Sequence, residues 1–73
     1  MGLKEEVIDL LASTLDVGKD ELVEDKKLYD SIGVDSTEVV ELSVALGKHF
    51  DVKIEANEVT KFSTPLEIAE LIA

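Results

Sequence analysis

The sequence predicts an all-α fold, an antiparallel four-helix bundle with a long first loop and a short third helix, formed by a single domain over residues 1–73. Three observations carry this prediction. Apolar residues recur at helical spacing near the N-terminus, and helix-start signals at residues 35–38 and 64–67 each precede a further apolar-periodic run. Residues 51–54 alternate like a strand, but with no partner strand we expect an extended connector there.

The amino-acid composition limits the functional classes to which this chain can belong. A chain of 73 residues is near the lower size for a stable single core, and its 45% hydrophobic content predicts a folded core despite a formal net charge of -10. That charge argues against binding nucleic acid or anionic lipid, and it favours basic protein partners. The absence of cysteine removes disulfides and thiol chemistry. With no signal peptide or membrane-spanning run, we expect a cytoplasmic monomer without membrane insertion.

The first helix is predicted from Leu3, Val7, Leu11 and Leu15, which share one face and are separated mainly by charged residues. It should end before Gly18. The region that follows, residues 16–34, has no clean period but holds scattered apolar residues. We therefore expect a long ordered loop there, with room for a helical turn at residues 20–24.

The second helix should begin after Asp35, an N-cap residue type followed three residues later by Glu38, and should run to Phe50. A helical wheel divides its residues into two faces. The predicted core face holds Val39, Leu42, Ser43, Leu46 and Phe50, and the exposed face holds Thr37, Glu38, Glu41, Val44, Ala45 and Lys48. Val44 is then either a singly exposed hydrophobic residue or the apolar centre of an acidic docking surface.

Two further helices are predicted. The short third helix should cover Ala56 to Lys61, with Val59 buried and Phe62 packed after it. The fourth has a stronger start signal, because Thr64 is a cap residue type, Pro65 suits the first helical position, and Glu67 completes a capping box.

The sequence contains little that could catalyse a reaction. His49 is the only histidine, and the wheel places it at the boundary between core and solvent. The carboxylates do not follow the spacing of an EF-hand loop, so no dedicated metal site is predicted. Ser36 has two interpretations: a structural serine in the first helical turn, or a modification site, since the helix N-terminus would stabilise an attached phosphate.

Gly33-Val34-Asp35-Ser36, opening a helix that runs Glu38-Val39-Val40-Glu41-Leu42 and ends at Phe50, resembles the acyl carrier protein family. The resemblance covers nearly the whole chain. It implies a non-catalytic carrier in which a phosphopantetheinyl transferase attaches 4′-phosphopantetheine from coenzyme A to Ser36. The thiol of this covalent arm would hold acyl intermediates as thioesters for acyl-transferring and chain-elongating enzymes of fatty-acid, lipid or polyketide synthesis.

The resemblance also implies two sets of site residues. Partner enzymes with basic patches would dock on Asp35, Thr37, Glu38, Glu41 and Val44. An acyl pocket would be lined by Val40, Leu46, Ile54, Val59, Phe62, Ile68 and Leu71, residues that can equally be plain core. Three departures from the family's usual sequence together favour a specialised carrier over a housekeeping one: Thr37 in place of leucine, Ser43 in place of an aliphatic residue, and Gly47-Lys48-His49 where acidic residues are common. The alternatives are a small acidic helical module that binds proteins or divalent ions, and a peptidyl or aminoacyl carrier.

Overall fold

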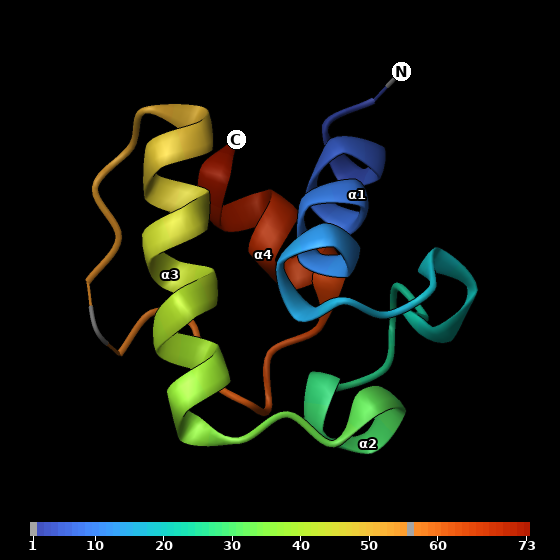
Figure 1. Ribbon diagram of the computed structural model, residues 1–73. Coiled ribbons are helices and arrows are strands. Elements are labelled where there is room, and N and C mark those ends of the chain that lie inside the picture. The colour runs from blue at the N-terminus through green and yellow to red at the C-terminus, as the bar shows by residue number, and fades with distance from the viewer. Residues whose placement is uncertain (1, 56) are drawn as a thin grey trace.

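The computed structural model describes residues 2–55 and 57–73 and is helical throughout its regular parts (Figure 1). The described residues form four α-helices and one 3₁₀ turn, and they contain no strand. The elements are α1 (Leu3–Leu15), η1 (Lys19–Glu21), α2 (Leu28–Ile32), α3 (Ser36–Phe50) and α4 (Pro65–Ile72). The predicted all-α class with four helices is confirmed.

Helix α1 is the central element, because it packs against both α3 and α4. In Figure 1, α3 runs antiparallel to α1, and α4 crosses behind the two. The buried core is entirely apolar among the described residues, with contributions from Val7, Leu11, Ala12, Leu22, Leu28, Val34, Val39, Leu42, Leu46, Val59, Ile68 and Ala69. Burial of these side chains is the main stabilising term for the fold. No helix in residues 2–55 or 57–73 is long and apolar enough to span a bilayer.

Helix α1 ends before Gly18, as predicted, but the residue that terminates it is Asp16. Asp16 adopts the left-handed conformation with φ of 57°, and aspartate is one of the few non-glycine residues that tolerates this region. The loop that follows contains η1 at the predicted helical turn. The Glu21 carboxylate closes that turn by accepting a 2.8 Å hydrogen bond from the Gly18 N–H.

The position predicted for the short third helix is wrong. Residues 57–61 form turns, while Ala56 lies outside the described residues. Side-chain oxygens in this region bond to nearby backbone N–H groups and so compete with helix formation. Ser63 Oγ accepts from the Thr60 N–H at 3.0 Å, and Thr60 Oγ1 accepts from the Phe62 N–H at 3.1 Å.

The short helix is instead α2, inside the long loop. It has no side-chain cap and ends at Gly33, which has φ of 66°, a conformation that suits glycine. Its first N–H groups are satisfied by distant backbone: Leu28 donates to the Ser63 carbonyl at 3.0 Å and Tyr29 to the Lys61 carbonyl at 2.8 Å. Tertiary contacts therefore stabilise α2, because five residues make too short a helix to be stable alone.

Both predicted capping boxes are present. Asp35 Oδ1 accepts from the Glu38 N–H at 2.8 Å, and Glu38 Oε1 accepts from the Asp35 N–H at 3.1 Å. At α4, Thr64 Oγ1 accepts from the Glu67 N–H at 3.0 Å, and Glu67 Oε1 accepts from the Thr64 N–H at 2.9 Å. These reciprocal bonds fix where α3 and α4 begin.

Candidate functional site

A pocket of about 370 Å³ lies between the N-terminal half of α3 and the segment that precedes α4. Its lining combines one serine hydroxyl, apolar side chains and a cation: Ser36, Val39, Val40, Val59, Thr60, Lys61 and Phe62. Val39 and Val59 are buried and form its inner wall. Val40 and Phe62 are 63% and 52% exposed, so the pocket is an open groove on the surface and not an enclosed cavity.

Ser36 is the first residue of α3, and it is exposed at this groove. The capping box aligns the first turn of the helix without using the Ser36 hydroxyl. The N–H groups of Ser36 and Thr37 belong to the first turn, where helix geometry provides no intrahelical acceptor. An anion on the Ser36 oxygen would therefore lie at the positive end of the α3 dipole.

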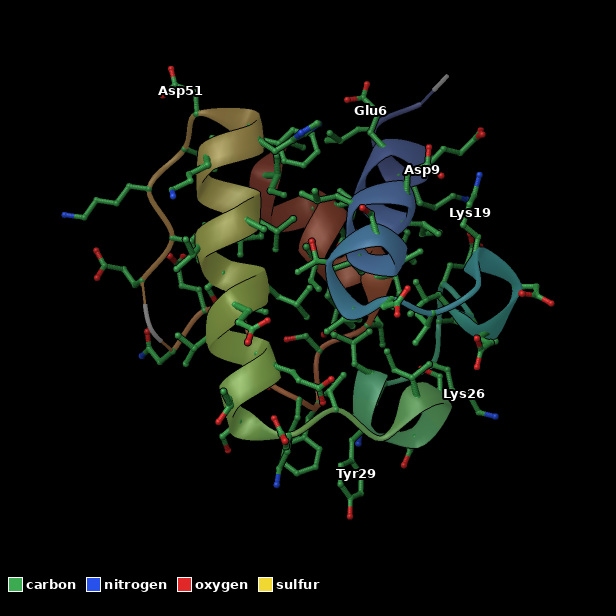
Figure 2. The ribbon with its side chains drawn as sticks, viewed as in Figure 1. Glu6, Asp9, Lys19, Lys26, Tyr29 and Asp51 are labelled. Atoms are coloured by element: carbon green, nitrogen blue, oxygen red, sulfur yellow. The ribbon has the colours of Figure 1, made fainter. Side chains whose placement is uncertain are left out.

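Lys61 and Phe62 line the same groove, and the Tyr29 ring lies next to both of them. The Lys61 ammonium lies 5.2 Å from the centroid of the Tyr29 ring and 5.5 Å from that of Phe62. The two rings are 6.0 Å apart and tilted by 57°. Lys27 lies 5.9 Å from the Phe62 centroid. Figure 2 shows Tyr29 projecting outward from α2 toward solvent.

Comparison with known proteins identifies the family. A family described as "Phosphopantetheine attachment site" matches residues 5–72. An "Acyl carrier protein" of Chlorobium phaeobacteroides is 36% identical over 70 residues, which cover 96% of this chain and 90% of that protein. One from Sulfurovum sp. is 36% identical over 64 residues (88% and 85%), and one from Syntrophobacter fumaroxidans is 33% identical over 67 residues (92% and 83%). The chain belongs to the acyl carrier protein family.

Membership of the acyl carrier protein family settles the class of cofactor and the absence of catalysis. The family is defined by covalently attached 4′-phosphopantetheine, and its domain is a carrier and not an enzyme. Carrier proteins in general are modified by a phosphopantetheinyl transferase and interact with synthase enzymes. The groove suits such a group, because it joins an anion-favouring helix N-terminus and a lysine to an apolar wall.

The surface predicted for partners of this acyl carrier protein family member is accessible. Asp35, Thr37 and Glu41 are exposed, Glu38 is half-buried, and the Val44 side chain is 51% exposed. The predicted division of α3 into two faces is confirmed, because Val39, Leu42 and Leu46 are buried on the opposite side. Ser43 is half-buried, and its hydroxyl donates to the Val39 carbonyl at 3.1 Å.

The residues predicted for the acyl pocket are distributed over three environments. Val40, Val59 and Phe62 line the groove beside Ser36. Leu46 and Ile68 are fully buried in the core, and Ile54 packs against it. Leu71 is 37% exposed.

Sequence reasoning missed the roles of Val39, Thr60 and Lys61 in the groove. Val39 was expected only as a core residue. Lys61 was expected only as the end of a helix. One signal could have found it: Lys61 is a cation directly before Phe62 in a strongly acidic chain.

Two lysines that do not line the groove have raised pKa values. A hydrogen bond to the Glu24 carboxylate, together with its charge, raises the pKa of Lys4. The same two effects from Asp9 raise the pKa of Lys19, whose Nζ lies 2.7 Å from Asp9 Oδ1 (Figure 2). Both are surface ion pairs, which contribute little to stability.

His49, predicted at the boundary between core and solvent, lies on the exposed side of that boundary. Its ring is exposed and contacts Phe50 edge-on, with centroids 4.7 Å apart. It borders a second depression, whose other lining residues are Glu6, Asp9, Leu10 and Ser13. Across residues 2–55 and 57–73, no cluster of three or more metal-ligating side chains is found.

Proposed function

We propose that Ser36 is the residue of this carrier to which 4′-phosphopantetheine is attached. The observation that supports this most strongly is the exposed Ser36 hydroxyl in the first turn of α3, at the edge of a groove that includes the N-terminus of that helix. The arm supplies a thiol that holds an acyl group as a thioester. Because the chain has no cysteine, that thiol has to come from the arm.

The attachment is a phosphoryl transfer from coenzyme A. The bond between Ser36 Oγ and phosphorus forms as the phosphoanhydride bond of coenzyme A breaks, and the adenosine bisphosphate half of coenzyme A leaves. A group of the transferase takes the proton of the hydroxyl. This chain presents the hydroxyl and stabilises the new phosphodiester at the α3 N-terminus. The catalytic groups and the metal belong to the transferase.

The proposed carrier uses the two faces of α3 differently. The groove formed by Val40, Val59 and Phe62 shelters the arm and the first part of the acyl group. Leu46 and Ile68 would line the acyl site only after the core separates, because both are already fully packed. Longer acyl chains therefore require α3 to move.

Partner enzymes are proposed to dock on the exposed face of α3. Asp35, Thr37, Glu38 and Glu41 precede Val44 along the helix, so an acidic stretch and an exposed apolar side chain together complement a basic patch. The overall charge of -10 would accelerate the encounter with such partners. A cytoplasmic, monomeric carrier acting as a single domain over residues 1–73 remains part of this proposal, as does a role specialised by Thr37.

Intact-mass spectrometry after co-expression with a broad-specificity phosphopantetheinyl transferase tests the proposal. We expect the wild type to gain the mass of one phosphopantetheine and Ser36→Ala to gain none. Ser13→Ala, which removes an exposed hydroxyl from α1, is the matched control and should load fully. Loading of Ser36→Ala, or no loading of the wild type, would overturn the assignment. Mass analysis of protein from its own host then reads the thioester directly.

A further inference from the structure

The groove beside Ser36 contains a positive charge in a strongly negative chain. The sequence has 7 basic residues against 17 acidic ones, yet one of the basic residues, Lys61, lines the same groove as the Ser36 hydroxyl. Lys61 is half-buried, and no carboxylate lies within ion-pairing distance of it among the described residues. Its charge is therefore available to an anion that enters the groove.

Aromatic rings and backbone bonds hold Lys61 in this position. Its ammonium group lies over both Tyr29 and Phe62, at 5.2 and 5.5 Å from the ring centroids, within the range of cation–π attraction. Its carbonyl accepts the 2.8 Å hydrogen bond from the Tyr29 N–H, which ties the residue to α2. Tyr29 and Phe62 are each about half exposed, at 50% and 52%, so neither ring is explained by core packing alone.

We propose that Lys61 is a positioning residue that supplies the countercharge for the phosphodiester on Ser36, and that Tyr29 and Phe62 keep it beside the groove before the arm is attached. This rests on the proposed attachment at Ser36. Once the arm is present, the ammonium group exchanges part of its contact with the rings for the phosphodiester. The arm is thereby drawn along the groove past Phe62, and away from the acidic docking face.

The charges around Ser36 explain why such a residue is needed. Asp35 and Glu38 flank Ser36, and their carboxylates are fixed close to it by the capping box. A phosphodiester adds a further negative charge among like charges, which is unfavourable at short range. The N–H groups of α3 offset part of this cost, and Lys61 is the side-chain cation that lines the same groove.

The test compares apo and loaded protein for the wild type and three variants. Lys61→Gln removes the charge, and Lys61→Arg keeps both the charge and the ability to lie over aromatic rings. Lys26→Gln is the matched control, because Lys26 is exposed, does not line the groove, and points in a different direction from Tyr29 (Figure 2). Intact mass first shows that each protein is loaded, and melting temperature and amide chemical shifts are then measured for both forms.

We expect loading to lower the melting temperature of Lys61→Gln relative to its apo form by roughly 2–4 °C more than it does for the wild type, the scale of one surface ion pair in a domain of this size. Lys61→Arg should restore the wild-type response, and Lys26→Gln should match the wild type. High salt should remove the difference. In the wild type, loading should shift the amide signals of Tyr29, Lys61 and Phe62.

The outcomes separate this proposal from the one it rests on. No mass gain in the wild type overturns both. Normal loading, with the same response to loading in Lys61→Gln and Lys26→Gln, leaves Ser36 as the attachment residue and overturns the role of Lys61. Unchanged signals of Tyr29 and Phe62 on loading also overturn it, because the ammonium group would then not have left the rings.

Discussion

Asp35 combines two roles that substitutions can separate: it caps α3 through its oxygen, and we propose that it docks partners through its charge. Asp35→Ala removes the 2.8 Å bond to the Glu38 N–H and leaves that group without its acceptor. Asp35→Asn keeps an oxygen acceptor in nearly the same place and removes only the charge. The two variants therefore predict different losses.

The expected sizes follow from the geometry. Loss of an N-cap side chain costs about 1 kcal/mol, and in a domain of this size that corresponds to a melting temperature roughly 4–8 °C lower. Asparagine caps as well as aspartate does. Its weaker interaction with the α3 dipole is opposed by relief of repulsion in a chain of net charge -10, so Asp35→Asn should melt close to the wild type.

Thermal melts followed by circular dichroism measure the first effect, and a time course of transferase loading by intact mass measures the second. Thr64→Ala removes the equivalent bond at α4 and is the comparison for a cap residue that does not line the groove. We expect Asp35→Asn to load several-fold more slowly at low salt although it is fully folded. If it melts as low as Asp35→Ala, the hydrogen bond is not the stabilising element. If it loads at the wild-type rate, Asp35 does not dock the transferase.

Two further predictions concern charges on the surface. Glu41→Lys should weaken engagement by partner enzymes in a salt-dependent manner without lowering the melting temperature, and unaltered loading kinetics at low salt would contradict the docking assignment. Lys4 and Lys19 have pKa values raised above 10.5 by Glu24 and Asp9, so their contribution to stability is present below that pH and is lost as pH rises through the raised values. The free energy of unfolding of the double variant Lys4→Gln, Lys19→Gln should therefore fall less than that of the wild type as the pH rises above 10.5. Chemical denaturation at several pH values measures both free energies, and an equal fall in the two proteins would refute this.

The parts of the fold that could be predicted are those whose signals are local. The starts of α3 and α4 are encoded by cap residues three positions apart, and both were placed correctly. Helix α2 has no such signal. It is held by N–H groups that bond to carbonyls of Lys61 and Ser63, far along the chain, and no pattern within residues 28–32 indicates those partners.

The residues of the candidate site likewise divide into those with a local sequence signal and those without one. Ser36 could be singled out because its helix start and its neighbours form a recognisable motif, and Val44 because a wheel shows its exposure. Lys61 was missed although its charge stands out in an acidic chain, because its relation to Ser36 depends on the turn that replaces the predicted third helix. Leu46 was assigned to the acyl pocket from a resemblance, and one-dimensional periodicity does not distinguish a groove wall from the interior behind it.

The backbone bonds between residues 28–29 and residues 61–63 have a topological consequence. They join the chain just before α3 to the chain just before α4, and a third bond, from the Leu66 N–H to the Glu24 carbonyl at 3.0 Å, reinforces the junction. Helix α3 and the connector after it therefore form a closed segment, whose two ends are held together at this junction. The entropy of closing such a segment changes only slowly with its length. The length of this segment is thus weakly constrained, whereas the junction, beside which Ser36 and Lys61 line the same groove, fixes the geometry that a partner enzyme meets.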